Sequence, residues 1–120
     1  MFAVLDGMPA STARRRAAGL LAEVGLREAA DRPARTLSGG ELQRLAVVRA
    51  LTSTRPLVLA DEPTNQLDRE NAARVMALLL DAARRDERAV VVVTHDVDAL
   101  PATCRVLGLG PGGLQSRTPG

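Results

Sequence analysis

The chain has 120 residues, of which 46% are hydrophobic and 25% are charged, a composition typical of a single globular domain. All 16 basic residues are arginine and Phe2 is the only aromatic residue, so small aliphatic side chains must build the core. A net charge of +2 without interleaved aromatic residues argues against a nucleic-acid surface. Apolar runs such as Ala89 to Val93 are far shorter than the roughly 20 residues that cross a bilayer, so we expect no direct membrane insertion.

Two amphipathic helices are predicted in the first half of the chain. Ser11 or Thr12 caps the first helix, which ends near Gly25, and the Arg14–Arg16 run lies mostly on its solvent side. The second helix spans about residues 41–53. The predicted apolar faces comprise Ala13, Ala17, Leu20, Leu21 and Val24 in the first helix, and Leu42, Leu45, Ala46, Ala50 and Leu51 in the second.

Strands and a helix alternate in the second half. The short apolar run 57–60 and the valine-rich run 89–94 are typical of parallel strands buried on both faces. Between them, Asp68 caps a helix predicted over residues 69–85. This order makes a parallel βαβ unit, so the predicted fold class is α/β. The remaining predicted segments are a strand at 105–109, a glycine-rich turn, and a loose tail at 115–120.

The sequence Ser38-Gly39-Gly40 opens the second predicted helix. Backbone N–H groups at a helix start, together with the helix dipole, make a site for an anion, and the Ser38 hydroxyl can donate one more hydrogen bond. A serine-capped helix after a turn explains the same residues, so this motif alone leaves both interpretations open.

Ionisable side chains follow both predicted strands of the βαβ unit. Asp61 and Glu62 come at the carboxyl end of the first strand, where one carboxylate can reach Mg²⁺ through water and the other can orient a water for attack on a phosphoryl group. His95 follows the second strand and can donate to a phosphate oxygen. The simpler interpretation of Asp61 and Glu62 is a pair of solvated acids that open a loop. The simpler interpretation of His95 is a polar residue at a sheet edge.

The order and spacing of these motifs carry a family resemblance. LSGGELQR, LVLADEPT, NQLD and VVVTHD follow one another and resemble the signature, Walker B, D-loop and H-loop motifs of ATP-binding cassette (ABC) proteins. The likeness runs from about Ser11 to Leu114 and is greatest to cassettes of the lipoprotein-releasing and macrolide-exporter type. It implies part of the helical subdomain over residues 1–36, half of a P-loop NTPase core over 37–114, and a tail over 115–120.

The resemblance also implies a role for each matching residue. Asp61 would hold Mg²⁺ through water, Glu62 would polarise the hydrolytic water, and His95 would clamp the γ-phosphate of ATP. Asp68 belongs to the D-loop, which contacts a second cassette. The residues that would close over ATP held by the opposite cassette of a head-to-tail dimer are Ser38, Gly39, Gly40 and Glu41, of which Glu41 replaces the more usual glutamine.

The sequence departs from the family at Walker A. No G-x-x-x-x-G-K-[ST] occurs, the chain has no lysine, and the Q-loop glutamine and adenine-stacking aromatic are missing too. We therefore expect the isolated chain to be inactive, and expect a truncated reading frame, a split cassette or a degenerate product. In the family the Walker A strand lies between the strands matching 89–94 and 105–109, so unpaired strand edges and exposed valines are expected.

The implied function is that of an ATP- and Mg²⁺-dependent ATPase subunit of an ABC transporter. Such a subunit is cytoplasmic and is held at the inner or cell membrane by a transmembrane permease partner. A soluble ABC protein that acts on ribosomes is the alternative, because Glu62-Pro63-Thr64-Asn65 resembles that subfamily, although Thr94 before His95 does not. A third hypothesis is a non-catalytic dimer half that supplies only its signature. The transported substrate is not encoded in these motifs.

Overall fold

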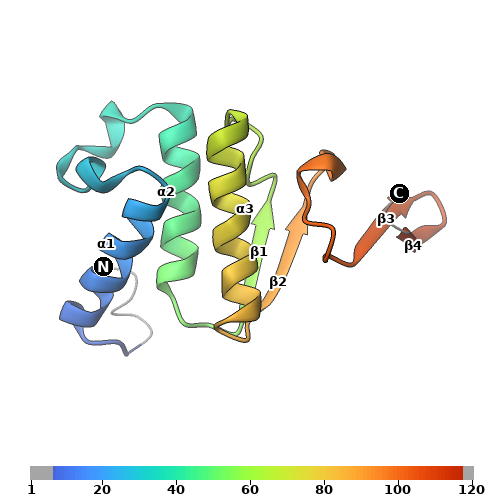
Figure 1. Ribbon diagram of the computed structural model, residues 1–120, viewed down its shortest axis with the longest axis horizontal. Helices are drawn as coiled ribbons and strands as arrows, with labels where there is room; N and C mark the ends of the chain where they lie inside the picture. The colour runs from blue at the N-terminus through green and yellow to red at the C-terminus, as the bar shows by residue number, and fades with distance from the viewer. Residues whose placement is uncertain (1–6, 118–120) are drawn as a thin grey trace.

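The computed structural model describes residues 7–117, so Phe2 lies outside the described part of the chain. Three helices stand side by side, a two-stranded sheet lies beside them, and a hairpin extends from the far end (Figure 1). In chain order the elements are α1 (Ala10–Glu23), the 3₁₀ turns η2 (Arg27–Asp31) and η3 (Ala34–Thr36), α2 (Gly39–Thr52), β1 (Leu57–Asp61), α3 (Arg69–Arg84), β2 (Ala89–Val93), η4 (Val97–Ala99), β3 (Val106–Gly110) and β4 (Gly113–Arg117).

The helix starts differ from the sequence prediction in two places. The cap position of α1 is Pro9, whose carbonyl accepts the Ala13 N–H at 3.0 Å. The prediction that Ser11 or Thr12 caps this helix is therefore wrong. Helix α2 begins at Gly39, two residues earlier than predicted, because the Ser38 side chain caps it. Asp68 caps α3 as predicted, by accepting the Asn71 N–H at 2.8 Å.

The βαβ unit is confirmed. Strands β1 and β2 pair in parallel, with Leu57 opposite Ala89 and Asp61 opposite Val93, and α3 makes the connection between them. Helix α3 packs against β2, while α2 packs against β1 and α3. The carboxyl ends of both strands therefore meet at one edge of the sheet, which is where open α/β sheets bind their ligands.

Only one face of this sheet is covered by the helices. Val58 is 3% exposed, whereas the alternate positions Leu59, Val91 and Val93 are 70%, 49% and 59% exposed. The prediction of strands buried on both faces was therefore wrong for the described residues, and the expectation of exposed valines is confirmed. Within residues 7–117, β2 pairs with β1 alone and β3 pairs with β4 alone, so both sheets keep open edges.

The C-terminal segment forms an antiparallel hairpin. Val106 on β3 lies opposite Arg117 on β4, and Gly110 lies opposite Gly113 at the turn. Residues 115–117, predicted as part of a loose tail, belong to β4 instead. The tail prediction missed this strand because a short polar segment gains its ladder bonds from a neighbour rather than from its own pattern.

The hydrophobic core lies between the three helices and β1. Helix α2 buries Val47, Val48 and Leu51. Of its predicted apolar face, Leu51 is buried and Leu45 packs against the core, whereas Leu42, Ala46 and Ala50 are exposed. The helix packs between α1 and α3, which rotates its buried face away from the predicted one. The core residues are Leu21, Val24, Leu26, Val47, Val48, Leu51, Val58, Val75, Met76, Leu78, Leu79 and Ala82.

Two arginine side chains donate hydrogen bonds to a backbone carbonyl at the carboxyl end of α2. The Arg16 guanidinium donates twice to the Leu51 carbonyl, at 3.0 and 3.2 Å, and the buried Arg88 side chain donates to the same oxygen at 3.4 Å. The last carbonyls of a helix lack intrahelical partners, so these bonds satisfy one of them. Arg16 is thus half-buried rather than solvated with the rest of its run.

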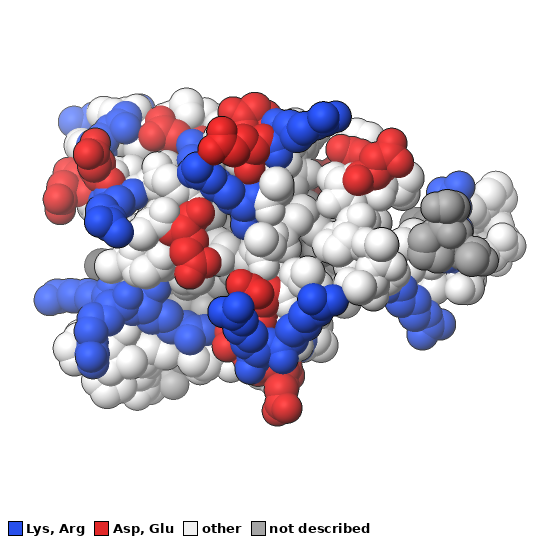
Figure 2. All heavy atoms as spheres, in the orientation of Figure 1, with Lys and Arg blue, Asp and Glu red and all other residues white. Residues whose placement is uncertain are grey.

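Arginine and acidic side chains are interspersed over the helical layer (Figure 2). Part of this pattern is local pairing within α3, such as Arg74 with Glu70 at 2.7 Å. No helix among the described residues combines the length and the hydropathy that a membrane span needs.

Candidate functional site

The start of α2 forms a capping box. The Ser38 hydroxyl oxygen accepts the Glu41 N–H at 3.1 Å, and the Glu41 carboxylate accepts the Ser38 N–H at 3.1 Å. Gly39 and Gly40 occupy the first helical turn, where N–H groups have no intrahelical acceptor. The box confirms the interpretation of Ser38 as a helix cap, and the anion site at these two amides stays a prediction.

Glu41 is held tightly in this box. The hydrogen bond from the Ser38 backbone is the main cause that lowers the pKa of Glu41 below its ordinary value. Burial opposes it, and the Ser38 hydroxyl and the nearby Arg32 and Arg44 charges lower the pKa further. Arg32 approaches the Glu41 carboxylate to 3.3 Å and also donates to the Thr36 carbonyl at 2.7 Å. In this arrangement the Glu41 carboxylate supports the helix start, and its contact with ATP on a second cassette stays a prediction.

The chain turns sharply after β1. Glu62 has a φ of 47°, a left-handed conformation that a residue with a side chain seldom adopts. Its N–H donates to the Val93 carbonyl at 2.7 Å, which extends the β1–β2 pairing by one residue. The turn thereby swings the Glu62 side chain over the end of β2.

Glu62 and His95 meet at the carboxyl edge of the sheet. One carboxylate oxygen lies 2.6 Å from His95 Nδ1 and accepts the His95 backbone N–H at 3.1 Å, while the other accepts the Thr94 hydroxyl at 3.3 Å. The hydrogen bond and charge of His95, and then the Thr94 bond, lower the pKa of Glu62, with burial opposing them. The contact requires a proton on Nδ1, so His95 can donate from Nε2 as well only when it is doubly protonated.

The D-loop lies against the start of α2. A Cβ placed on Gly39 would collide with the Gln66 side-chain oxygen, and one on Gly40 would lie 3.2 Å from the Gln66 carbonyl oxygen. The flexible Gln66 side chain could move away from a Cβ on Gly39, whereas a Cβ on Gly40 would require the Gln66 backbone to shift by a few tenths of an ångström. Asp68 ends the segment, and its carboxylate is engaged in capping α3.

Comparison with known proteins identifies the family of the chain. The ABC transporter family profile matches residues 4–65, which are 62 of the 120 residues. The chain belongs to the ABC transporter family. It spans about half the length of the curated relatives that it matches.

Two relatives and one solved structure illustrate the likeness. The chain is 47% identical to a lipoprotein-releasing system ATP-binding protein of Caulobacter vibrioides over 110 residues, 89% of this chain and 47% of that protein. It is 46% identical to a phosphonates import ATP-binding protein of Stutzerimonas stutzeri over 107 residues, 88% of this chain and 39% of that protein. A dimeric ATP-binding cassette in a post-hydrolysis state, bound to ADP and phosphate, is 40% identical with a TM-score of 0.67 over 77% of this chain and 40% of that chain.

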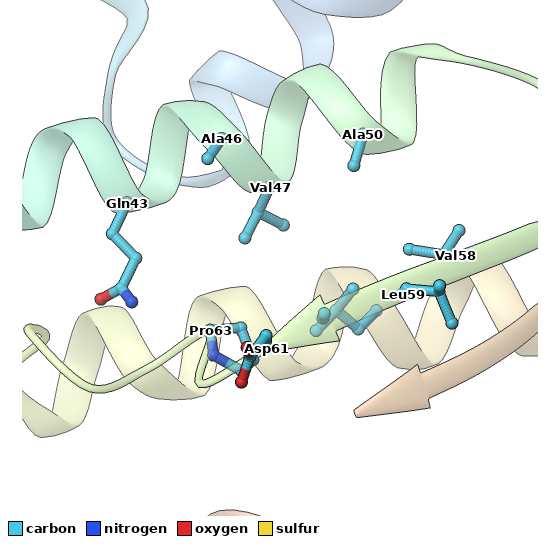
Figure 3. A pocket seen from close by; sticks show the side chains of 10 residues that line it. Gln43, Ala46, Val47, Ala50, Val58, Leu59, Asp61 and Pro63 are labelled. Atoms are coloured by element: carbon cyan, nitrogen blue, oxygen red, sulfur yellow. The ribbon is translucent and has the colours of Figure 1, made fainter. Parts of the chain in front are cut away.

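Asp61 differs from Glu62 and Asp68 in its position, at the border of a groove. It is exposed at the end of β1 and borders an apolar groove of about 200 Å³ between β1 and α2 (Figure 3). The described residues contain no group of three metal-ligating side chains. A single carboxylate suits Mg²⁺, because this ion keeps most of its water and takes further oxygens from substrate phosphates.

Some residues of the ABC site were not predicted from the sequence. Gln43 bonds to both ends of the 62–66 turn, and Thr94 bonds to the Glu62 carboxylate. Arg44 joins the helices by donating to the Val24 carbonyl at 2.6 Å and to the Asn71 side chain at 3.1 Å. Gln43 and Arg44 are the last two letters of LSGGELQR, but their partners lie 19 or more positions away, so the motif itself does not reveal them.

Proposed function

We propose that the chain is part of the ATP-binding subunit of an ABC transporter and supplies the hydrolysis-side groups of an ATP site. The Glu62–His95 contact of 2.6 Å at the carboxyl edge of the parallel sheet carries this proposal. It joins residues of two separate motifs, 33 positions apart, at the place where ligands of α/β sheets bind. Relatives that are more than 40% identical are transporter subunits, which favours this reading over a ribosome-acting ABC protein.

The proposed roles follow from the geometry of each side chain. Asp61 would hold Mg²⁺ through water, and the bound ion would neutralise charge on the phosphates. Glu62, kept ionised by its lowered pKa, suits orienting a water better than removing its proton outright. His95 is mostly exposed, and a doubly protonated ring would offer Nε2–H to the terminal phosphate while Nδ1–H stays on Glu62.

The start of α2 would serve a different nucleotide. Ser38, Gly39 and Gly40 present a helix start on the molecular surface, and the resemblance assigns such residues to the ATP bound by a second cassette. We propose a head-to-tail pairing of two cassettes, in which the D-loop residue Asp68 lies near the contact while capping α3. A permease would be the membrane partner, and through it the subunit would be held at the cytoplasmic side of the membrane.

The open face of the β1–β2 sheet is the place for the rest of the cassette. Leu59, Val91 and Val93 present apolar surface beside the edge of β2 that has no partner strand within residues 7–117, an arrangement that favours further strand pairing. These 120 residues contain no lysine, so the lysine that grips the phosphates must come from the segment or chain that covers this face. By itself the 120-residue chain is expected to show no ATP turnover in a radiolabelled assay.

Substitution of Glu62 tests the proposed function. In a cassette completed with a Walker A segment, Glu62→Gln should abolish phosphate release while ATP still binds, because the amide keeps the shape and loses the charge. Glu87→Gln is the matched control, since Glu87 also has a positive φ, of 53°, but precedes β2 at the opposite edge of the sheet. Undiminished phosphate release by Glu62→Gln would remove Glu62 from the hydrolytic role.

A further inference from the structure

The Gln43 side chain bridges the turn that follows β1. From α2 it points toward the residues after that strand, beside Asp61 and Pro63 (Figure 3). Its Nε2 donates to the Glu62 carbonyl oxygen at 2.7 Å, and its Oε1 accepts the Gln66 N–H at 2.9 Å. One half-buried amide thus uses both its donor and its acceptor on the two ends of the 62–66 turn.

The backbone of Glu62 needs such support. A left-handed φ of 47° persists in a residue with a side chain only when the surroundings over-determine it. On one side the Glu62 N–H is bonded to Val93 in the sheet, and on the other the Glu62 carbonyl is bonded to Gln43 on α2. The turn's own bond to this carbonyl, from the Asn65 N–H, is longer at 3.3 Å. Gln43 therefore makes the shorter of the two bonds that fix this carbonyl.

The same turn also rests on the first residues of α2. Gly39 and Gly40 leave room for Gln66 to lie directly over them, so the turn contacts the helix at its start and again at Gln43. The start of α2 and the turn that carries the Glu62 backbone are therefore in direct contact within one chain.

We propose that Gln43 is a positioning residue for the Glu62 carboxylate: it holds the 62–66 turn on α2 and thereby sets Glu62 against His95. Its consequence for hydrolysis rests on the proposed function, whereas the placement itself does not.

The single histidine of the chain makes the placement measurable. In a pH titration of the full 120-residue chain followed by NMR, the His95 imidazole signals should show a low-pH inflection from Glu62, below the ordinary pKa of 4.5. Glu62→Gln should remove that inflection and so assign it. Gln43→Met keeps the side-chain length and loses both bonds, so the inflection should move up toward 4.5. Leu42→Ala, an exposed neighbour on α2, should leave it in place.

A second variant separates the two bonds of Gln43. Gln43→Glu keeps an acceptor for the Gln66 N–H but loses the donor to the Glu62 carbonyl. It should retain slow hydrogen exchange at Gln66 and still shift the Glu62 inflection upward, and it carries the test if Gln43→Met does not fold. An unmoved inflection in a folded Gln43 variant would overturn the positioning role and reduce Gln43 to a local structural contact.

Turnover in the completed cassette distinguishes this proposal from the proposed function. Gln43→Met should lower kcat by about 10- to 100-fold with KM for ATP unchanged, the effect of a small displacement of a reacting group. Full turnover in Glu62→Gln would refute the proposed function, yet the NMR shifts would still establish the placement. Unchanged kcat in Gln43→Met, alongside an inactive Glu62→Gln, would contradict the positioning role alone.

Discussion

Two neighbouring residues of β1 test whether the outer face of the sheet is open. Val58 faces the helices and is 3% exposed, whereas Leu59 faces outward and is 70% exposed. Val58→Ala removes two buried carbon atoms, each worth about 0.8 kcal/mol, and leaves a small cavity, so we expect a loss of about 2 kcal/mol of unfolding free energy. Leu59→Ala removes three carbons that are only about a third buried and leaves no cavity, so we expect a loss below about 1 kcal/mol.

Urea denaturation of the 120-residue chain, followed by far-ultraviolet circular dichroism, measures both values. The order of the two costs should change in a completed cassette. Once a further strand and its layer cover the outer face, Leu59→Ala should cost about 2 to 5 kcal/mol, the usual range for truncating a buried leucine.

Equal losses for Val58→Ala and Leu59→Ala in the dilute chain would contradict the open-face reasoning. Self-association through the same apolar face could bury Leu59, so the measurement is repeated at several protein concentrations. A Leu59 cost that matches the Val58 cost and does not change with concentration would refute the assignment of this face as the docking surface for the rest of the cassette.

Two further predictions concern individual carboxylates. His95→Ala should raise the pKa of Glu62 toward 4.5 in a carboxyl ¹³C titration. The lowered pKa stabilises the folded state above pH 4.5, and this stabilisation is lost as the pH falls through the pKa of Glu62 in the folded state. The unfolding free energy of His95→Ala should therefore depend less on pH in the acid range. An unchanged pKa of Glu62 in this variant would contradict the contact. Asp68→Ala should lower stability by about 1 kcal/mol through loss of the α3 cap, whereas the exposed Asp98→Ala should change it by less than about 0.5 kcal/mol; equal effects would rule out the cap.

Hydrogen bonds within the chain occupy most of the Glu62 carboxylate. Glu62 accepts bonds from both the backbone and the ring of His95 and from Thr94, so little of its carboxylate is available to a water. In the proposed arrangement the terminal phosphate takes Nε2–H while Nδ1–H stays on Glu62, so Glu62 would orient a water through the lone pairs that these bonds leave free.

Local sequence determined much of this fold. Asp68 and Ser38 start their helices because short polar side chains satisfy the free N–H groups that follow them, an effect confined to a few neighbouring residues. The β1–α3–β2 order predicted parallel strands, and parallel strands with polar ends place Asp61, Glu62 and His95 at one edge. Those predictions needed no knowledge of distant contacts.

Tertiary packing decided the rest, because its contacts join positions far apart in the chain. The valine-rich β2 has the same apolar pattern whether one face or two are covered, so only the arrangement of the layers shows that Val91 and Val93 are open. The buried face of α2 depends on where α1 and α3 lie, which periodicity does not reveal. Gln43 likewise has an ordinary place on a helix, and only the fold brings it to the carbonyl of Glu62, 19 residues later.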